Sequence, residues 1–296
     1  MACSQARVSL GIFPEVHMQI YRSLDEVKEA GTIAPDSIVN ADCLEAMKFI
    51  PDRSIDAIVC DLPYGITACK WDVVIPFDLL WEQYKRIIKP NGAIALFGSQ
   101  PFTSALVMSN PKWYRHQWVW NKNNSAGFVT ARIRPFAITE EISIFGQLKV
   151  NYYPQMETRG PLRTKGGYSK SQNYGIEPTK SRSRSNTYYP KNIIDISNAS
   201  QANKKHPTQK PVALIEYLLK TYSLEGELIL DNTAGSGTLA IAAINTNRRY
   251  ICIEKDPDYF EVMRNRIETH DPNALAIPKK TRKPRAITEG QLALFC

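Results

Sequence analysis

The four residues Asp61-Leu62-Pro63-Tyr64 place a carboxylate, a backbone carbonyl and an aromatic ring within one short turn. They follow an apolar run at residues 56–60 that is typical of a buried parallel strand. In open α/β sheets, ligands bind in the crevice at the carboxyl ends of the strands. Two acceptors beside a flat ring suit an exocyclic amine on a stacked base, and the alternative is a plain turn that binds nothing.

A glycine loop forms the second candidate site, with the residues Asp231, Asn232, Thr233, Ala234, Gly235, Ser236, Gly237 and Thr238. Its glycines let the backbone approach a ligand, and the helix expected after the loop offers free N–H groups at its N-terminus. Glu254 ends the next apolar run roughly 20 residues after Gly235, where an acid binds ribose hydroxyls. This pattern fits NAD and S-adenosylmethionine alike, and also a tight turn followed by an ordinary acid.

Short apolar runs alternate with helical patterns along most of the chain, which indicates a doubly wound α/β sheet. Buried strands are predicted at residues 56–60, 93–97, 117–120, 141–145, 227–231 and 250–254. Helices are predicted at residues 77–88, after Pro211, before Asn245 and at 257–269. Both candidate motifs therefore come directly after predicted strands.

The composition excludes several classes of protein. With 43% hydrophobic and 22% charged residues in a chain of 296, neither a disordered chain nor a disulfide-stapled miniprotein is indicated. No apolar run is long enough for a membrane span or a signal peptide, so a cytoplasmic protein is expected. The six cysteines include no CxxC pair, and we therefore expect no metal site.

The positive charge is concentrated in one segment. The chain has 37 Lys and Arg against 29 Asp and Glu. Residues 151–205 hold ten of these cations but only three acids, together with six tyrosines. This mixture suits phosphate contacts and stacking on nucleotides, and the alternative is a solvated flexible insertion. The residues expected to contact DNA are Lys122, Arg132, Arg134, Arg182 and Arg184.

Three segments carry a resemblance to a known family. Asp61-Leu-Pro-Tyr64 resembles the D/N/S-P-P-Y/F signature of the amino-methyltransferases of DNA, and the loop at 231–238 is similar to their D-P-F-A-G-S-G-T motif. Lys205-His-Pro-Thr-Gln-Lys-Pro211 is similar to the segment before their cofactor half. The catalytic motif precedes the cofactor motif, an order that resembles the β group of the family, a circular permutation of the usual methyltransferase chain.

The resemblance implies an α/β fold, a doubly wound Rossmann-like methyltransferase sheet with an inserted target-recognition region. The expected organisation is an N-terminal extension (1–36), a catalytic half (37–120), a basic target-recognition region (121–205), a cofactor-binding half (206–270) and a basic C-terminal tail (271–296). Leu62 departs from the signature, since it replaces the first proline. Asn232-Thr233 replaces Pro-Phe and removes an aromatic ring expected on the cofactor adenine.

The same resemblance implies S-adenosylmethionine as cofactor. Asp42 and Cys43 would lie beside its adenine and Glu254 would bind its ribose. The methionine side would be lined by His206, Thr208 and Lys210. Local sequence leaves other roles open, because Asp42 suits a helix N-cap, His206 a structural turn before proline, and Lys210 the protein surface.

The implied activity is methyl transfer from S-adenosylmethionine to adenine N6 in duplex DNA, by base flipping and direct transfer. Aspartate rather than serine at position 61 favours adenine over cytosine N4. The rival hypotheses are a cytosine-N4 enzyme, an NAD-dependent oxidoreductase and a catalytically inactive DNA-binding module. A homodimer and a cognate restriction endonuclease are compatible with this interpretation, and no metal or membrane partner is expected.

Overall fold

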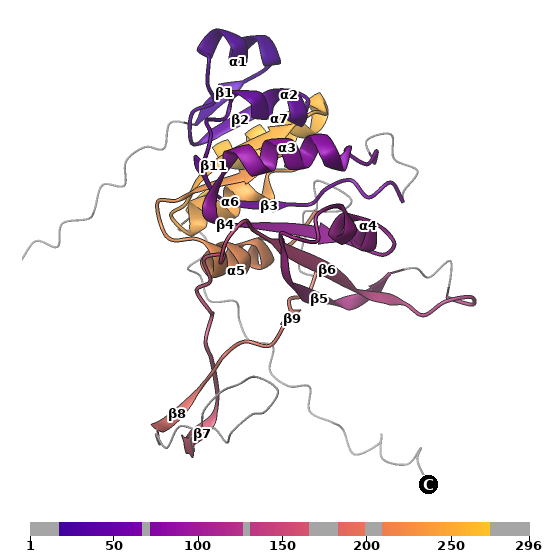
Figure 1. Cartoon of the computed structure of the whole chain (residues 1–296), viewed down its shortest axis with the longest axis vertical. Helices are drawn as coiled ribbons and strands as arrows, with labels where there is room; N and C mark the ends of the chain where they lie inside the picture. Colours follow the sequence, from indigo (N-terminus) through magenta and orange to yellow (C-terminus); the bar gives the residue numbers. More distant parts are fainter. Residues whose placement is uncertain (1–17, 67–71, 127–130, 166–182, 199–208, 273–296) are drawn as a thin grey trace, which may run out of the picture.

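A mixed β-sheet forms the centre of the protein (Figure 1). The computed structural model describes residues 18–66, 72–126, 131–165, 183–198 and 209–272. Within these residues the sheet has nine strands in the order β1-β2-β11-β10-β3-β4-β6-β5-β9. Their bounds are β1 (Gln19–Tyr21), β2 (Ser37–Asn40), β3 (Ile55–Cys60), β4 (Ile88–Gly98), β5 (Tyr114–Ala126), β6 (Ala137–Phe145), β9 (Ile193–Asp195), β10 (Leu228–Asp231) and β11 (Arg249–Glu254).

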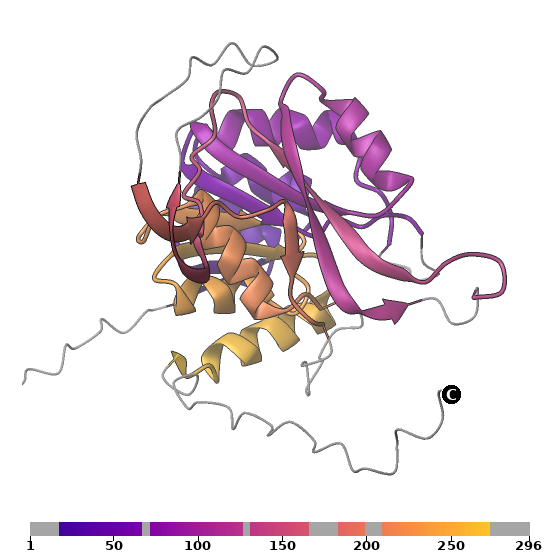
Figure 2. The ribbon, with the colours of Figure 1, turned by 90° about the horizontal axis from the view of Figure 1, so that it is seen from below.

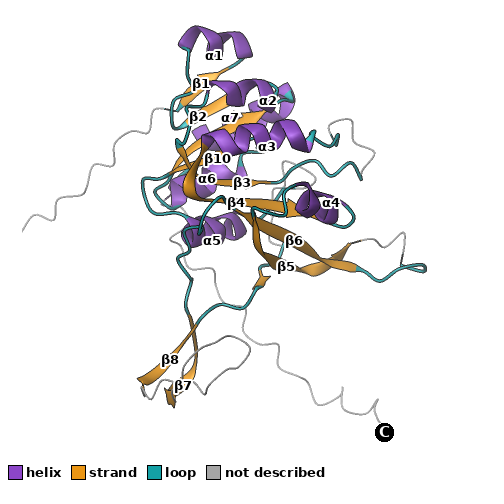
Figure 3. Cartoon of the chain, viewed as in Figure 1, coloured by secondary structure: helices purple, strands orange, loops and turns teal. Residues whose placement is uncertain are grey.

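Helices cover both faces of this sheet (Figures 2 and 3). One face packs against α1 (Leu24–Ala30), α2 (Cys43–Ala46), the short 3-10 helix (Met47–Phe49), α3 (Phe77–Ile87) and α4 (Phe102–Ser109). The other packs against α5 (Val212–Tyr222), α6 (Thr238–Asn245) and α7 (Pro257–Glu268). Successive strand residues point to opposite faces, so Ala57 and Val59 contact the α5–α7 layer while Ile58 and Cys60 contact the α1–α4 layer. The predicted doubly wound α/β fold is confirmed.

The order of the strands creates a switch point between β10 and β3. All neighbouring strands from β1 to β4 run parallel, whereas β6 runs antiparallel to both β4 and β5. From β10 the chain continues to β11 on one side, and from β3 it continues to β4 on the other. A crevice forms where two such connections diverge, at the carboxyl ends of the strands. Both predicted motifs begin there.

Part of the segment predicted as an N-terminal extension belongs to the sheet. Residues 19–21 form the edge strand β1, which pairs in parallel with β2. Helix α1 follows, with Ser23 accepting a hydrogen bond from the Glu26 N–H and with Gly31 in the left-handed region at its end. These elements are too short to show a period in the sequence. Pairing with the neighbouring strand β2 holds β1 in the sheet.

The basic segment contains regular structure that the sequence did not indicate. Strands β7 (Glu157–Lys165) and β8 (Ser183–Tyr188) form an antiparallel ribbon that projects away from the body of the protein, whereas β9 joins the edge of the main sheet beside β5 (Figure 1). No residue of the ribbon belongs to the described apolar core. In the described part of the chain, no helix combines the length and apolarity needed to cross a membrane.

Candidate active site

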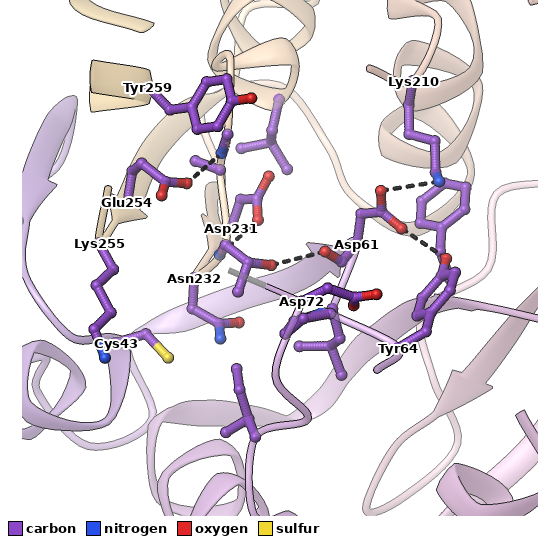
Figure 4. Close-up of a pocket in the computed structure, with 18 of the residues that line it drawn as sticks. Cys43, Asp61, Tyr64, Asp72, Lys210, Asp231, Asn232, Glu254, Lys255 and Tyr259 are labelled. Carbon is purple, nitrogen blue, oxygen red and sulfur yellow. Dashed lines mark hydrogen bonds and ion pairs between the residues drawn. The ribbon is translucent and has the colours of Figure 1, made fainter. Parts of the chain in front are cut away.

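A cavity of about 880 Å³ lies at the carboxyl ends of β3, β10 and β11 (Figure 4). Its size is in the range of small-molecule sites. It unites both predicted motifs, since the lining includes Asp42, Cys43, Asp61, Leu62, Pro63, Tyr64, Lys210, Asp231, Asn232, Thr233, Ala234, Gly235, Ser236, Thr238 and Glu254.

Asp61 follows β3 directly and is held by two neighbours. Its Oδ1 accepts a hydrogen bond of 2.7 Å from the Tyr64 hydroxyl, and its Oδ2 lies 2.9 Å from the Lys210 ammonium (Figure 4). Burial raises the pKa of the Asp61 carboxyl above its usual value, and the charge of Lys210 opposes this rise. A carboxylate has about four lone-pair positions, so both oxygens can still accept a further hydrogen bond.

The turn after β3 presents Tyr64 as an aromatic surface. The ring lies 4.9 Å from that of Phe102, centre to centre, and is fixed on that side. Asp72 shapes the turn by accepting hydrogen bonds from the N–H groups of Gly65 and Ile66. Burial raises the pKa of the Tyr64 hydroxyl well above its usual value, so this group remains a neutral donor to Asp61.

The glycine loop leads from β10 into α6 and approaches Glu254. Gly237 has a φ of 73°, and a Cβ there would lie 2.6 Å from the Met263 side chain, so both backbone and space require glycine. The Gly235 N–H donates to Glu254 Oε2 at 2.7 Å, and the Asp256 N–H donates to Oε1 at 2.8 Å. These bonds aim the carboxylate into the cavity with lone pairs left for hydroxyl groups (Figure 4).

Helix α7 helps to position Glu254. Its N-cap Asp256 accepts hydrogen bonds from the N–H groups of Asp258 and Tyr259, and Pro257 occupies the first helical position. The chain therefore enters a capped helix directly after β11, with the N-cap two residues after Glu254. Burial raises the pKa of Glu254.

The residues that depart from the family pattern join the two motifs. The Thr233 hydroxyl donates a 3.0 Å hydrogen bond to the Asp61 carbonyl. The Tyr84 hydroxyl donates to Asn232 Oδ1 at 2.6 Å, and the buried Cys60 thiol lies beside the same amide. Asp231 accepts from the Thr233 N–H, and burial raises its pKa to about 7. Asn232 and Thr233, which stand in place of Pro-Phe, thus link the glycine loop to the end of β3 by polar contacts.

Asp42 and Cys43 line the side of the cavity next to Lys255. Asp42 caps α2 by accepting from the Leu44 N–H at 3.0 Å, and its other oxygen pairs with Lys255 at 3.1 Å. The N-cap role and a place in the cavity are therefore both present. Burial raises the pKa of the Cys43 thiol to about 11, which keeps it protonated and unsuited to nucleophilic attack.

The residues expected to bind DNA have different surroundings. Lys122 on β5 is buried and pairs with Glu140, whereas Arg132 and Arg134 are exposed between β5 and β6. Arg184 is exposed on β8 of the projecting ribbon. His206, Thr208 and Arg182 lie outside the described residues.

Sequence reasoning did not find several residues of the cavity. Glu140 on β6 contacts Lys210, and the rings of Phe97 and Trp120 lie beside the same ammonium. Asp72 shapes the turn that follows β3, as described above. The sequence shows Glu140 only as an acid next to a predicted strand. Its pairing with Lys210 could not be predicted, because the two residues lie 70 positions apart in the chain. Among the described residues, no cluster of His, Cys, Asp and Glu could hold a metal ion.

Comparisons with known proteins identify the family of the chain. Residues 55–265 match the N6/N4 methyltransferase family described as DNA methylase. The type II methyltransferase M.HpaI of Haemophilus parainfluenzae is 25% identical over 248 residues, which cover 78% of this chain and 74% of that protein.

Two solved structures have a similar fold. One is the complex of M1.HpyAVI with S-adenosylmethionine, at 24% identity and a TM-score of 0.54, with 78% of this chain and 98% of that chain covered. The other is the cytosine-N4-specific PvuII DNA methyltransferase, at 15% identity and a TM-score of 0.58, with 82% of this chain and 91% of that chain covered.

The family match spans most of the chain and contains both the turn at residues 61–64 and the glycine loop at 231–238. These motifs meet in one cavity, with Asp61 on one side and Glu254 on the other (Figure 4). The chain therefore belongs to the N6/N4 DNA methylase family of DNA amino-methyltransferases, whose methyl donor is S-adenosylmethionine.

Proposed function

We propose that this methyltransferase modifies the N6 amino group of adenine in duplex DNA. The observation that carries the proposal is the carboxylate of Asp61, which lies in the cavity beside the Tyr64 ring and has acceptor positions left for an amine. A carboxylate rather than a hydroxyl at the first motif position favours adenine over cytosine.

The cavity residues fit S-adenosylmethionine by the chemistry of their polar groups. Glu254 offers two carboxylate oxygens to ribose hydroxyls, and the glycine loop brings backbone N–H groups close to the ligand. Asp42 and Cys43 are the proposed neighbours of the adenine ring. The cofactor supplies an electrophilic sulfonium methyl group when it is bound.

Asp61 and the Leu62 carbonyl are the proposed acceptors for the two amino protons of the target base. The nitrogen lone pair of an adenine amine is delocalised into the ring, so it is a poor nucleophile. Hydrogen bonds from both protons draw the nitrogen toward a tetrahedral geometry and direct the lone pair at the methyl group. Tyr64 provides the stacking surface, and the role of Asp61 is to orient the amine.

A paired adenine is stacked inside the duplex, so the base must rotate out of the helix to reach Asp61. Its unstacking costs a few kcal/mol. Stacking on Tyr64 and hydrogen bonds to the base edge offset this cost in the proposed complex. The ring of Tyr64 is held by Phe102 before the base arrives, which reduces the entropy lost on binding.

The β7–β8 ribbon is the proposed recognition element. A two-stranded ribbon fits the major groove of B-DNA, where each base pair presents a distinct pattern of donors and acceptors. Arg163 and Arg184 are exposed on opposite strands, and because Arg163 is opposite Ser185 they point to opposite faces of the ribbon. Arg132 and Arg134 are proposed DNA contacts from the β5–β6 connection. A homodimer and a cognate restriction endonuclease stay predictions.

Replacing Glu254 with alanine should weaken binding of S-adenosylmethionine by ~1–3 kcal/mol, because hydroxyl groups would lose partners in a buried polar site. Calorimetric titration measures this change as a roughly 5- to 150-fold higher Kd. Glu268→Ala removes a similar side chain from the exposed end of α7 and serves as the control. An unchanged Kd for Glu254→Ala would refute the assignment of this acid to the ribose.

Analysis of the product tests the proposed function. Duplex DNA is incubated with the protein and labelled S-adenosylmethionine, digested to nucleosides and separated by liquid chromatography with mass detection. The label should be recovered as N6-methyladenine. Recovery as N4-methylcytosine alone would show that Asp61 is not a guide to the target base, and binding without any labelled product would support an inactive DNA-binding module.

A further inference from the structure

Four alternating charges form a continuous chain that ends at the catalytic carboxylate. The Lys210 ammonium lies 2.9 Å from Asp61 Oδ2 and 2.9 Å from Glu140 Oε2. The second oxygen of Glu140 lies 3.2 Å from the Lys122 ammonium. These residues come from separate places, namely the end of β3, the segment before α5, β6 and β5. The array is electrically neutral. Lys210 contacts two carboxylates, and Glu140 contacts two ammonium groups.

The surroundings hold Lys210 in place. Its side chain is only 9% exposed, and that of Glu140 is 16% exposed. The Lys210 nitrogen lies 5.1 Å from the centre of the Phe97 ring, 5.8 Å from Trp120 and 5.9 Å from Tyr64. Cation–π contacts at such distances are attractive in a poorly solvated site. Lys210 therefore cannot turn to water without leaving its anionic and aromatic partners.

We propose that Glu140 is a positioning residue for methyl transfer, which acts on the Asp61 carboxylate through Lys210. Glu140 holds the ammonium at the position where it fixes Asp61 Oδ2, and the Tyr64 hydroxyl fixes Oδ1. The two remaining acceptor positions of Asp61 are then oriented before the base enters. The inference rests on the proposed role of Asp61, and it assigns to Lys210 a task at the target amine rather than at the methionine side of the cofactor.

The charges give this arrangement a measurable signature. The titratable groups around Asp61 are Lys210, Glu140, Tyr64 and, from the glycine loop, Asp231. The positive charge of Lys210 lowers the pKa of Asp61, whereas the negative charge of Glu140 raises it. Loss of either charge should therefore move the titration of Asp61, and in opposite directions. A purely structural disturbance of the cavity gives no reason for opposite movements.

The test uses Lys210→Met and Glu140→Gln in the full chain. In single-turnover methylation of duplex DNA, Lys210→Met should move the acidic limb of the pH profile upward by ~1–3 pH units. Glu140→Gln should move this limb downward. It should also lower the rate on the alkaline plateau by roughly 10- to 100-fold, because Lys210 and with it Asp61 are no longer held in one position. Lys210→Arg keeps the charge and should restore the limb to the wild-type position.

Three further measurements separate the possible failures. The first follows the carboxyl-carbon resonance of Asp61 as a function of pH, with S-adenosylmethionine bound and without DNA. This resonance is assigned by its loss in Asp61→Asn. The pKa of Asp61 should be higher in Lys210→Met and lower in Glu140→Gln than in the wild type. The Kd for the cofactor should change by less than twofold in Glu140→Gln, which also reports correct folding. Glu268→Gln, with the same loss of charge at the end of α7, should behave as wild type.

Wild-type rates in Glu140→Gln together with an unchanged Asp61 titration would overturn the inference, and so would movement of both variants in the same direction. A different outcome would contradict the proposed function alone. In it, the wild type methylates no base, but the pKa of Asp61 still moves in opposite directions in Lys210→Met and Glu140→Gln.

Discussion

Asp61→Ala is expected to lower the rate of methyl transfer by roughly 100- to 1,000-fold while the protein still binds S-adenosylmethionine. The loss follows because the amine no longer meets an oriented carboxylate. Cofactor binding should persist because Glu254 and the glycine loop lie on other strands, β10 and β11, and make contacts of their own. Single-turnover kinetics and calorimetric titration give the two halves of this result.

The neutral variant Asp61→Asn distinguishes charge from shape. It has nearly the volume of aspartate but its amide cannot pair with Lys210 in the same way, so it should also be slow. Asp25→Asn makes the same change on the exposed helix α1, where Asp25 pairs with Lys28, and should retain full activity. A turnover of Asp61→Ala near that of the wild type would show that the catalytic assignment is wrong.

Removal of residues 160–185 should abolish sequence-specific methylation and leave the α/β core folded. Thr158 and Thr187 face each other in the ribbon, so the remaining Arg159-Asn186 forms a two-residue connection, a common hairpin length. The deleted part contributes nothing to the described apolar core. Thermal unfolding and cofactor titration should therefore stay close to the wild type, while methylation of a cognate duplex falls to the level on unrelated DNA.

A single substitution refines this prediction. If Arg184 contacts a phosphate, Arg184→Ala weakens binding to all sequences alike and reduces the slope of log K against log salt by roughly one. If it reads a guanine edge, the loss is ~1–3 kcal/mol at one base position. Lys28→Ala on the exposed surface of α1 removes the same charge as a control. Methylation of the same target site by the deletion variant would show that recognition lies elsewhere.

The central strands could be predicted because strands buried on both faces consist of continuous apolar runs. The run at 56–60 corresponds to β3 and the run at 250–254 to β11, each within one residue of the observed start. The glycine loop was a candidate site because two glycines lie between a predicted strand and a predicted helix, and its similarity to the family motif distinguished it from a dinucleotide loop or a tight turn. These local signals sufficed to predict that both motifs follow strands of one α/β sheet, and the comparisons confirm the family and its cofactor.

The remainder depends on contacts between distant segments, which leave no local pattern. Strand β1 has three residues and pairs only because β2 lies beside it. Glu140 looks like an ordinary strand acid until β6 brings it to Lys210. Lys122 was expected on DNA from its charge, but in the structure it is buried against Glu140. A phosphate would have to compete with that carboxylate.

Sequencing of DNA from cells that express the protein, by a method that reads modified bases, tests the central claim most directly. The control is an isogenic culture that expresses Asp61→Ala, which shares the fold and the proposed DNA contacts. The account predicts N6-methyladenine at one recurring short sequence in the first culture and its absence from the second. Adenines that remain unmodified in both cultures, or cytosines that carry the methyl group instead, would contradict it.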